Sequence, residues 1–299
     1  IDVIFPPAAM GAIIAVIGLE LAPVAANMAG LTGDKIDMVN VAISMFTLAV
    51  GVIGSVAFRG FMSIIPILFG VICGYIFAAI MGIVNFQPVI DAPWFQIPHF
   101  YAPVFDINAI LIIAPAALVV LAEHIGHLVV TGNIVERDLI KDPGLSRPLF
   151  ADGLSNVISG FAGATPNTTY GENIGVMAIT KVYSTWVIGG AAVMAIILSF
   201  CGKLSELIHS IPVPVMGGIC ILLFGVIAAS GIRVLVERQV DYSKSSNLVM
   251  TSVIMIIGLS GAKLSFGAFS VQGMVLATVV AIIMSLAFKL FEYLHLLNE

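Results

Sequence analysis

Long apolar stretches with few charges dominate the 299-residue chain and limit what it can fold into. Only 10% of the residues are charged, whereas a globular domain carries about 25%, so the chain cannot cover itself with a water-solvated surface. This excludes a soluble enzyme, a nucleic-acid binder and a disordered chain. The runs are too long for barrel strands and lack a two-residue alternation. The composition therefore predicts an all-α polytopic membrane protein.

Ten segments approach the roughly 20 apolar residues that a helix needs to cross the hydrocarbon layer. The fifth, sixth and ninth are short, and the sixth is polar for a membrane segment. The predicted spans cover residues 8–28, 38–58, 61–84, 108–130, 149–164, 170–181, 183–202, 212–232, 247–261 and 271–291.

The positions of Lys and Arg predict the orientation of these spans, because cytoplasmic connections are enriched in both. Nine of the 12 Lys and Arg fall on one side if both termini of the chain lie inside, leaving Lys35, Lys203 and Lys263 outside. The connection 85–106 then lies outside, and its Trp94 and Tyr101 predict an interfacial loop.

A short motif occurs twice, at the start of the first and of the eighth predicted span. Residues 5–13 (FPPAAMGAI) resemble residues 211–219 (IPVPVMGGI), at an offset of 206 residues. A repeat of seven spans places its second copy upside down, which is the architecture of many secondary transporters.

The repeat predicts that spans precede this chain, because the fourth to seventh segments have no counterparts in it. Roughly a hundred residues and four spans should be missing before Ile1, so the chain would be the last ten of fourteen spans. The start at Ile1, without an initiator Met or a targeting signal, fits a cut.

Glu123 and His127 form the first candidate site, in the fourth segment. An ionisable group within a span costs about 3 kcal/mol, so each one is a functional candidate. His127 lies one helical turn after Glu123 on the same face, while His124 points elsewhere. A carboxylate beside an imidazole can share or relay a proton. The alternative is a satisfied pair that only holds helices together.

The stretch 165–181 (TPNTTYGENIGVMAITK) provides the second candidate site. Its proline and threonines favour an extended chain over 166–170, and apolar residues with helical spacing resume at Ile174. We therefore predict a broken span whose half-helix begins near Glu172 and presents N–H groups to a polar substrate. Gly171 would let a ligand approach the backbone. The alternative is a loop between two short helices.

Residues 172–181 (ENIGVMAITK) match every fixed position of the signature of the nucleobase:ascorbate transporter family, also called nucleobase:cation symporter-2. The flanking TPNTTYG and AEHIGH segments are similar to those of its bacterial uracil:proton symporters. The resemblance implies a fold of seven plus seven inverted spans divided into core and gate domains. It places gate at 1–84 and 207–299, an extracytoplasmic interfacial loop at 85–107 and core at 108–206, with spans one to four absent.

The resemblance also implies roles for individual residues. Glu123, Glu172 and Gly171 would bind the nucleobase, and His127 with Glu123 would couple a proton. The residues expected to support these contacts are Tyr170, Asn173 and Thr169.

The function expected from these features is proton-coupled uptake of uracil across the bacterial cytoplasmic membrane by alternating access, and not an enzymatic activity. Xanthine or another nucleobase is the alternative substrate. The expected partners are a nucleobase, the proton and membrane lipid, with a homodimer left open; no nucleic acid and no cofactor besides the proton are expected.

Other charged residues allow plainer interpretations. A metal site formed by Glu123, His124 and His127 is a further alternative, but these three cannot converge from one helix without distortion. Glu20 and Asp152 are expected to make caps or helix contacts rather than to carry protons.

Overall fold

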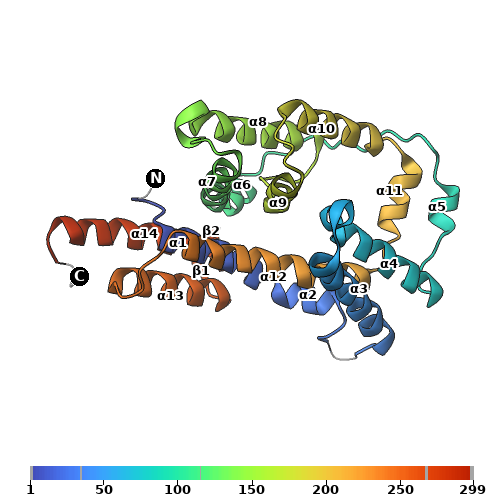
Figure 1. Ribbon diagram of the computed structural model, residues 1–299, viewed down its shortest axis with the longest axis horizontal. Helices are drawn as coiled ribbons and strands as arrows, with labels where there is room; N and C mark the ends of the chain where they lie inside the picture. Colours follow the sequence, from blue (N-terminus) through green and yellow to red (C-terminus); the bar gives the residue numbers. More distant parts are fainter. Residues whose placement is uncertain (1–2, 34–35, 115, 267–268, 297–299) are drawn as a thin grey trace. The chain divides into compact units, whose positions relative to one another are not determined.

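The computed structural model is mostly helical (Figure 1). It describes residues 3–33, 36–114, 116–266 and 269–296. The chain gathers into two compact units. Unit 1 takes residues up to 21, 101–171 and from 224 onward, and unit 2 takes 22–100 and 172–223.

A helix occupies each of the ten predicted segments. The α-helices are α1 (Pro7–Glu20), α2 (Ala22–Met28), α3 (Met38–Ala57), α4 (Pro66–Ile80), α5 (Gln87–Asp91), α6 (Ile107–Ile113), α7 (Ala116–Val135), α8 (Ser146–Ala162), α9 (Gly171–Thr180), α10 (Thr185–Ser199), α11 (Gly202–His209), α12 (Val213–Glu237), α13 (Ser245–Leu259) and α14 (Gly273–Tyr293). A 3₁₀ turn, η1 (Gly60–Ile64), precedes α4, and an irregular turn, η2 (Ile140–Gly144), precedes α8.

Fewer helices than segments are long enough to cross a bilayer alone. Among the described residues, four are sufficiently long and apolar: Pro7–Met28, α3, α12 and α14. The 15 residues of α4 and of α13 rise only about 22 Å. α10 and α11 form a pair bent by 88°. The predicted positions of the helices are confirmed. Several of the helices are too short to cross a bilayer as one straight helix.

Unit 1 is built around α1, which is buried on nearly every side. Its small and branched residues from Ala8 to Val16 lie in one core cluster with Ile125 of α7, Ile254 of α13 and Ala277 of α14. A helix that is apolar all round fits this central place.

Small residues let α1 approach α12 closely within unit 1. A Cβ atom on Gly231 would lie 2.6 Å from the carbonyl oxygen of Gly11, and one on Gly18 would meet the backbone of Ala228. Later residues of α1 contact earlier residues of α12, so the two helices run antiparallel.

Glu20, at the end of α1, caps the start of α14. Its Oε2 accepts a hydrogen bond of 2.8 Å from the backbone N–H of Met274. Gly273 has a φ of +55°, and the carboxylate occupies the space that a Cβ would need there. The prediction that Glu20 makes a helix contact is therefore confirmed.

In unit 2, α11 holds the predicted outer loop. Lys203 Nζ donates to the carbonyl oxygens of Val89, at 3.0 Å, and Ile90, at 2.9 Å, and lies 5.6 Å from the ring centre of Trp94. Phe95 stacks on Phe200 at the start of this bend. These contacts give a structural role to Lys203, one of the three Lys and Arg residues that the sequence analysis places outside.

A two-stranded antiparallel hairpin precedes α14 and was not expected from the sequence. Strands β1 (Lys263–Phe266) and β2 (Phe269–Gln272) pair Lys263 with Gln272 and Leu264 with Val271.

Candidate functional site

The predicted break in the sixth segment is present. α8 ends at Ala162 and is capped by Gly163, residues 164–170 form neither helix nor strand, and α9 begins at Gly171. Pro166 lacks a backbone N–H and disfavours a helical conformation at the residue before it, which explains the extended chain. A ten-residue helix follows directly, so this geometry fits the broken span and also the alternative of a loop between two short helices.

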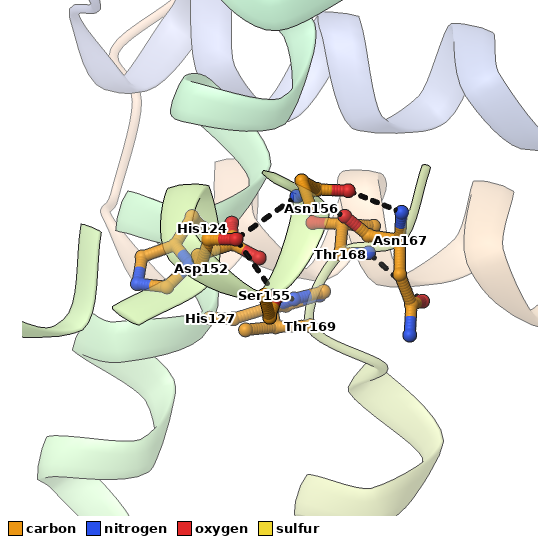
Figure 2. Close-up of polar contacts among 8 residues, drawn as sticks. All are labelled: His124, His127, Asp152, Ser155, Asn156, Asn167, Thr168 and Thr169. Carbon is orange, nitrogen blue, oxygen red and sulfur yellow. Dashed lines mark hydrogen bonds and ion pairs between the residues drawn. The ribbon is translucent and has the colours of Figure 1, made fainter. Parts of the chain in front are cut away.

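His127 contacts both the extended segment and the start of α9. Its Nδ1 atom forms a hydrogen bond of 2.8 Å with Thr169 Oγ1 (Figure 2). A Cβ on residue 171 would lie 3.1 Å from His127 Nε2, so glycine lets the imidazole reach the helix start. Both ring nitrogens thus face the broken span.

His124 has a different partner, as the sequence predicted. It is 4% exposed, and its Nδ1 lies 3.2 Å from Asp152 Oδ2 on α8, although the contact lacks hydrogen-bond geometry. Figure 2 shows this pair apart from the pair of His127 and Thr169. Asp152 therefore makes the helix contact expected of it.

Asn156 is a residue that the sequence analysis missed. Its side-chain Nδ2 donates to the carbonyl oxygen of Asn167 at 2.9 Å, and its Oδ1 accepts from the backbone N–H of Asn167 at 2.6 Å. Asn167 in turn accepts from the N–H of Thr168 through its own Oδ1, at 2.9 Å. An asparagine one turn after Asp152 in an apolar helix was the available signal.

The other predicted site residues are only partly defined. Glu123 is half-buried on α7. Glu172 is the second residue of α9, and its side chain lies outside the described part of the structure. Tyr170 is 59% exposed, and Asn173 is also exposed. The structure thus brings together His127, Thr169 and Gly171.

The arrangement suits proton and hydrogen-bond chemistry. Imidazole titrates near neutral pH, and a helix start such as that of α9 presents N–H groups that have no partner within the helix and carry a partial positive charge. His124 and His127 are directed to different partners, and no group of three His, Cys, Asp or Glu within the described ranges could hold a metal ion.

Comparison with known proteins agrees with the signature. A family model described as Permease family matches residues 1–267. The uracil permease of Escherichia coli (strain K12) is 64% identical over 298 residues, covering 99% of this chain and 70% of that protein. The uracil permease of Paenibacillus larvae subsp. larvae is 60% identical, covering 100% and 72%, and that of Bacillus subtilis (strain 168) is 46% identical, covering 95% and 68%.

These matches confirm the family resemblance found in residues 172–181, and with it a transporter rather than an enzyme. The chain belongs to the Permease family and is a multi-pass membrane protein.

Proposed function

We propose that the protein takes up uracil across the bacterial cytoplasmic membrane together with protons, by alternating access. The observation that carries this proposal is the 64% identity, along 99% of the chain, to a protein named uracil permease. The meeting of His127, Thr169 and Gly171 at a broken helix gives the proposal a chemical basis.

The proposed binding mode matches uracil's donors and acceptors to the chain. Uracil offers two N–H donors, which suit the carboxylates of Glu123 and Glu172, and two carbonyl oxygens, which suit backbone N–H groups such as that of Gly171. Tyr170 and Asn173 flank this point in the chain and would support it.

The coupling ion in this proposal is a proton held by Glu123 or His127, with no other cofactor. Protonation of this pair from outside would favour uracil binding, because a proton shared with His127 balances the negative charge of Glu123 while the carboxylate accepts a uracil N–H. Release of the proton inside would weaken binding. The hydrogen bond to Thr169 fixes the imidazole in one orientation during this exchange.

The proposed scaffold is the inverted repeat of seven plus seven spans, with core and gate domains and with both termini of this chain inside. α1 begins at Pro7 and α12 at Val213, which matches the repeat offset of 206 residues. Their antiparallel contact through Gly11 and Gly231 fits an inverted pair. In this orientation the contacts of Lys203 with Val89 and Ile90 lie on the outer side of the membrane. The proposal also includes a homodimer and bound lipid.

Uptake assays on the full-length protein that carries this chain test the site. Glu172→Gln, Glu123→Gln and His127→Ala should each reduce accumulation of radiolabelled uracil by at least about tenfold. The two Gln variants each remove a proposed charge-assisted contact, and His127→Ala removes the proposed proton site and the hydrogen bond to Thr169. Glu237→Gln, in an exposed pair with Arg233, is the control and should accumulate uracil normally. Normal accumulation in all three site variants would refute the assigned roles.

The substrate is tested separately by competition. Unlabelled uracil, thymine, xanthine and ascorbate are compared for displacement of labelled uracil from purified protein. Displacement by uracil at the lowest concentration supports the proposal, and stronger displacement by xanthine would favour the alternative substrate.

A further inference from the structure

We propose that Asn156 is a positioning residue, which holds the extended segment 164–170 so that Thr169 and Gly171 meet His127. The inference rests on the proposed function of this site and adds a residue that contacts neither uracil nor the proton. Asn156 lies on α8 and the segment it holds leads into α9, so one side chain joins α8 to the extended segment.

The side-chain amide of Asn156 carries the same two groups as a peptide bond and pairs with Asn167 as a neighbouring strand would. It accepts from the N–H of Asn167 at 2.6 Å and donates to its C=O at 2.9 Å. An extended chain inside a membrane protein has no helical partners for its backbone, and an unpaired group costs several kcal/mol in the absence of water. Asn156 satisfies both groups of one residue.

The orientation of Asn156 is itself fixed by its own helix. Nδ2 also donates to the carbonyl oxygen of Asp152 at 3.0 Å, one turn earlier on α8. A side chain bonded at three points keeps one rotamer, so the segment is held at a defined distance from α8. Figure 2 shows the amide lying between the two backbones.

The held residue is close in sequence to the groups that contact His127. Asn167 lies two residues before Thr169, whose hydroxyl bonds His127 Nδ1, and four before Gly171, against which Nε2 lies. Release of Asn167 would let this short stretch move, and both contacts would loosen together. The proposed binding groups would then need to be ordered again at each binding event.

The experiment compares three variants of the full-length protein in detergent: Asn156→Ala, Asn156→Asp and Ser155→Ala. Asn156→Asp keeps an oxygen for the Asn167 N–H but loses the donor. Ser155 is the matched control, because its hydroxyl donates to the same Asp152 carbonyl at 2.8 Å and forms no hydrogen bond with the described residues of the segment. The measurements are hydrogen exchange of residues 164–170 and the Kd for uracil per folded molecule.

We expect Asn156→Ala to speed exchange in 164–170 and to weaken uracil binding, each by about tenfold. Asn156→Asp should give intermediate values, and Ser155→Ala should stay within about twofold of wild type. A role confined to general stability would lower the melting temperature and yield but leave the Kd of the folded protein unchanged. If Asn156→Ala does not fold, the same measurements on Asn156→Asp test the inference.

Two results would overturn the inference: wild-type exchange and Kd in both Asn156 variants, or equal losses in Ser155→Ala. A failure of the proposed function has a different signature, because the wild-type protein would then not bind uracil. Exchange in 164–170 needs no uracil, so it still decides whether Asn156 holds the segment.

Discussion

The imidazole of His127 and the hydroxyl of Thr169 are joined by a hydrogen bond of 2.8 Å across 42 residues of chain. One partner belongs to the middle of α7 and the other to an extended stretch, so the bond ties a rigid helix to a break in another span. Protonation of the His127 imidazole would change its hydrogen bond with Thr169, and with it the contact between α7 and the extended segment.

Removal of the Thr169 hydroxyl should weaken transport. Thr169→Val preserves shape but deletes a hydrogen bond worth about 1 kcal/mol, so uracil uptake should fall about fivefold. Thr165→Val, an exposed position in the same segment, is the matched control and should behave as wild type. Uptake in proteoliposomes measures both, and equal rates in the two variants would contradict a role for the Thr169 bond.

A methyl group at residue 171 should displace His127. Gly171→Ala places a Cβ 3.1 Å from Nε2, which requires the ring or the helix start to shift by a few tenths of an ångström. We expect uracil affinity to fall by about tenfold, measured by calorimetry. Gly160→Ala on α8 has no neighbour within 4 Å and is the control. Unchanged affinity in Gly171→Ala would show that the close approach is unimportant.

Much of this site could be predicted from the sequence because its signals are local. Pro166 and the following threonines break the helix, and Ile174 resumes the helical spacing, so the break appeared where expected. Asn156 could not be assigned a partner, since its contact with Asn167 depends on how α8 and the segment fold together. Tertiary pairing of this kind leaves no pattern in the neighbouring residues.

The elements that the sequence analysis missed are short. α11 carries Lys203, Glu206 and His209 in eight residues, so its hydropathy resembles that of a loop. Its helix forms where Lys203 can reach the carbonyls of Val89 and Ile90, which are far away in sequence. The strands from Lys263 to Gln272 are likewise stabilised by each other rather than by composition.

Loss of the Glu20 carboxylate should destabilise unit 1. Glu20→Ala leaves the N–H of Met274 without its acceptor and removes a negative charge from a helix start, at a cost of about 1–2 kcal/mol. Thermal unfolding in detergent should show a lower midpoint. Glu237→Ala removes only an exposed ion pair with Arg233 and should change the midpoint little. Equal midpoints for both variants would exclude a capping role.

The contact between α1 and α12 should not tolerate a side chain. Gly231→Ala would place a methyl group 2.6 Å from Gly11 O, and backbone atoms cannot rotate away, so we expect a loss of about 1–3 kcal/mol. Gly225→Ala lies on the same helix with nothing within 4 Å and should be neutral or slightly stabilising. Denaturant titration separates the two, and similar stability would argue against close packing here.

The exposed ion pair of Asp138, which precedes η2, and Lys141, within η2, should affect the pKa of Asp138 but not transport. The hydrogen bond from the Lys141 ammonium, 3.0 Å away, holds the pKa of Asp138 below its ordinary value of 3.8. The pair therefore stabilises the fold above the unfolded-state pKa, and this contribution is lost as pH falls through the lowered folded-state pKa.

Lys141→Gln should move the pKa of Asp138 upward, as followed by carbon NMR of the carboxyl group. Asp138 stays ionised between about pH 5 and 8 in either protein, so the pH profile of uptake should be unchanged. An altered profile would place Asp138 in the coupling pathway.

The bond between Glu20 and Met274 also bears on the order in which the protein is made. α1 leaves the ribosome long before its partners, because the N–H that its last residue caps is synthesised 254 residues later and its neighbours α13 and α14 come from the same late part. Translation proceeds at about 5–20 residues per second, so α1 must wait many seconds in the bilayer. During that interval its glycine- and alanine-rich surface is exposed to lipid or to other helices, so chaperoning by the insertion machinery would matter for this helix.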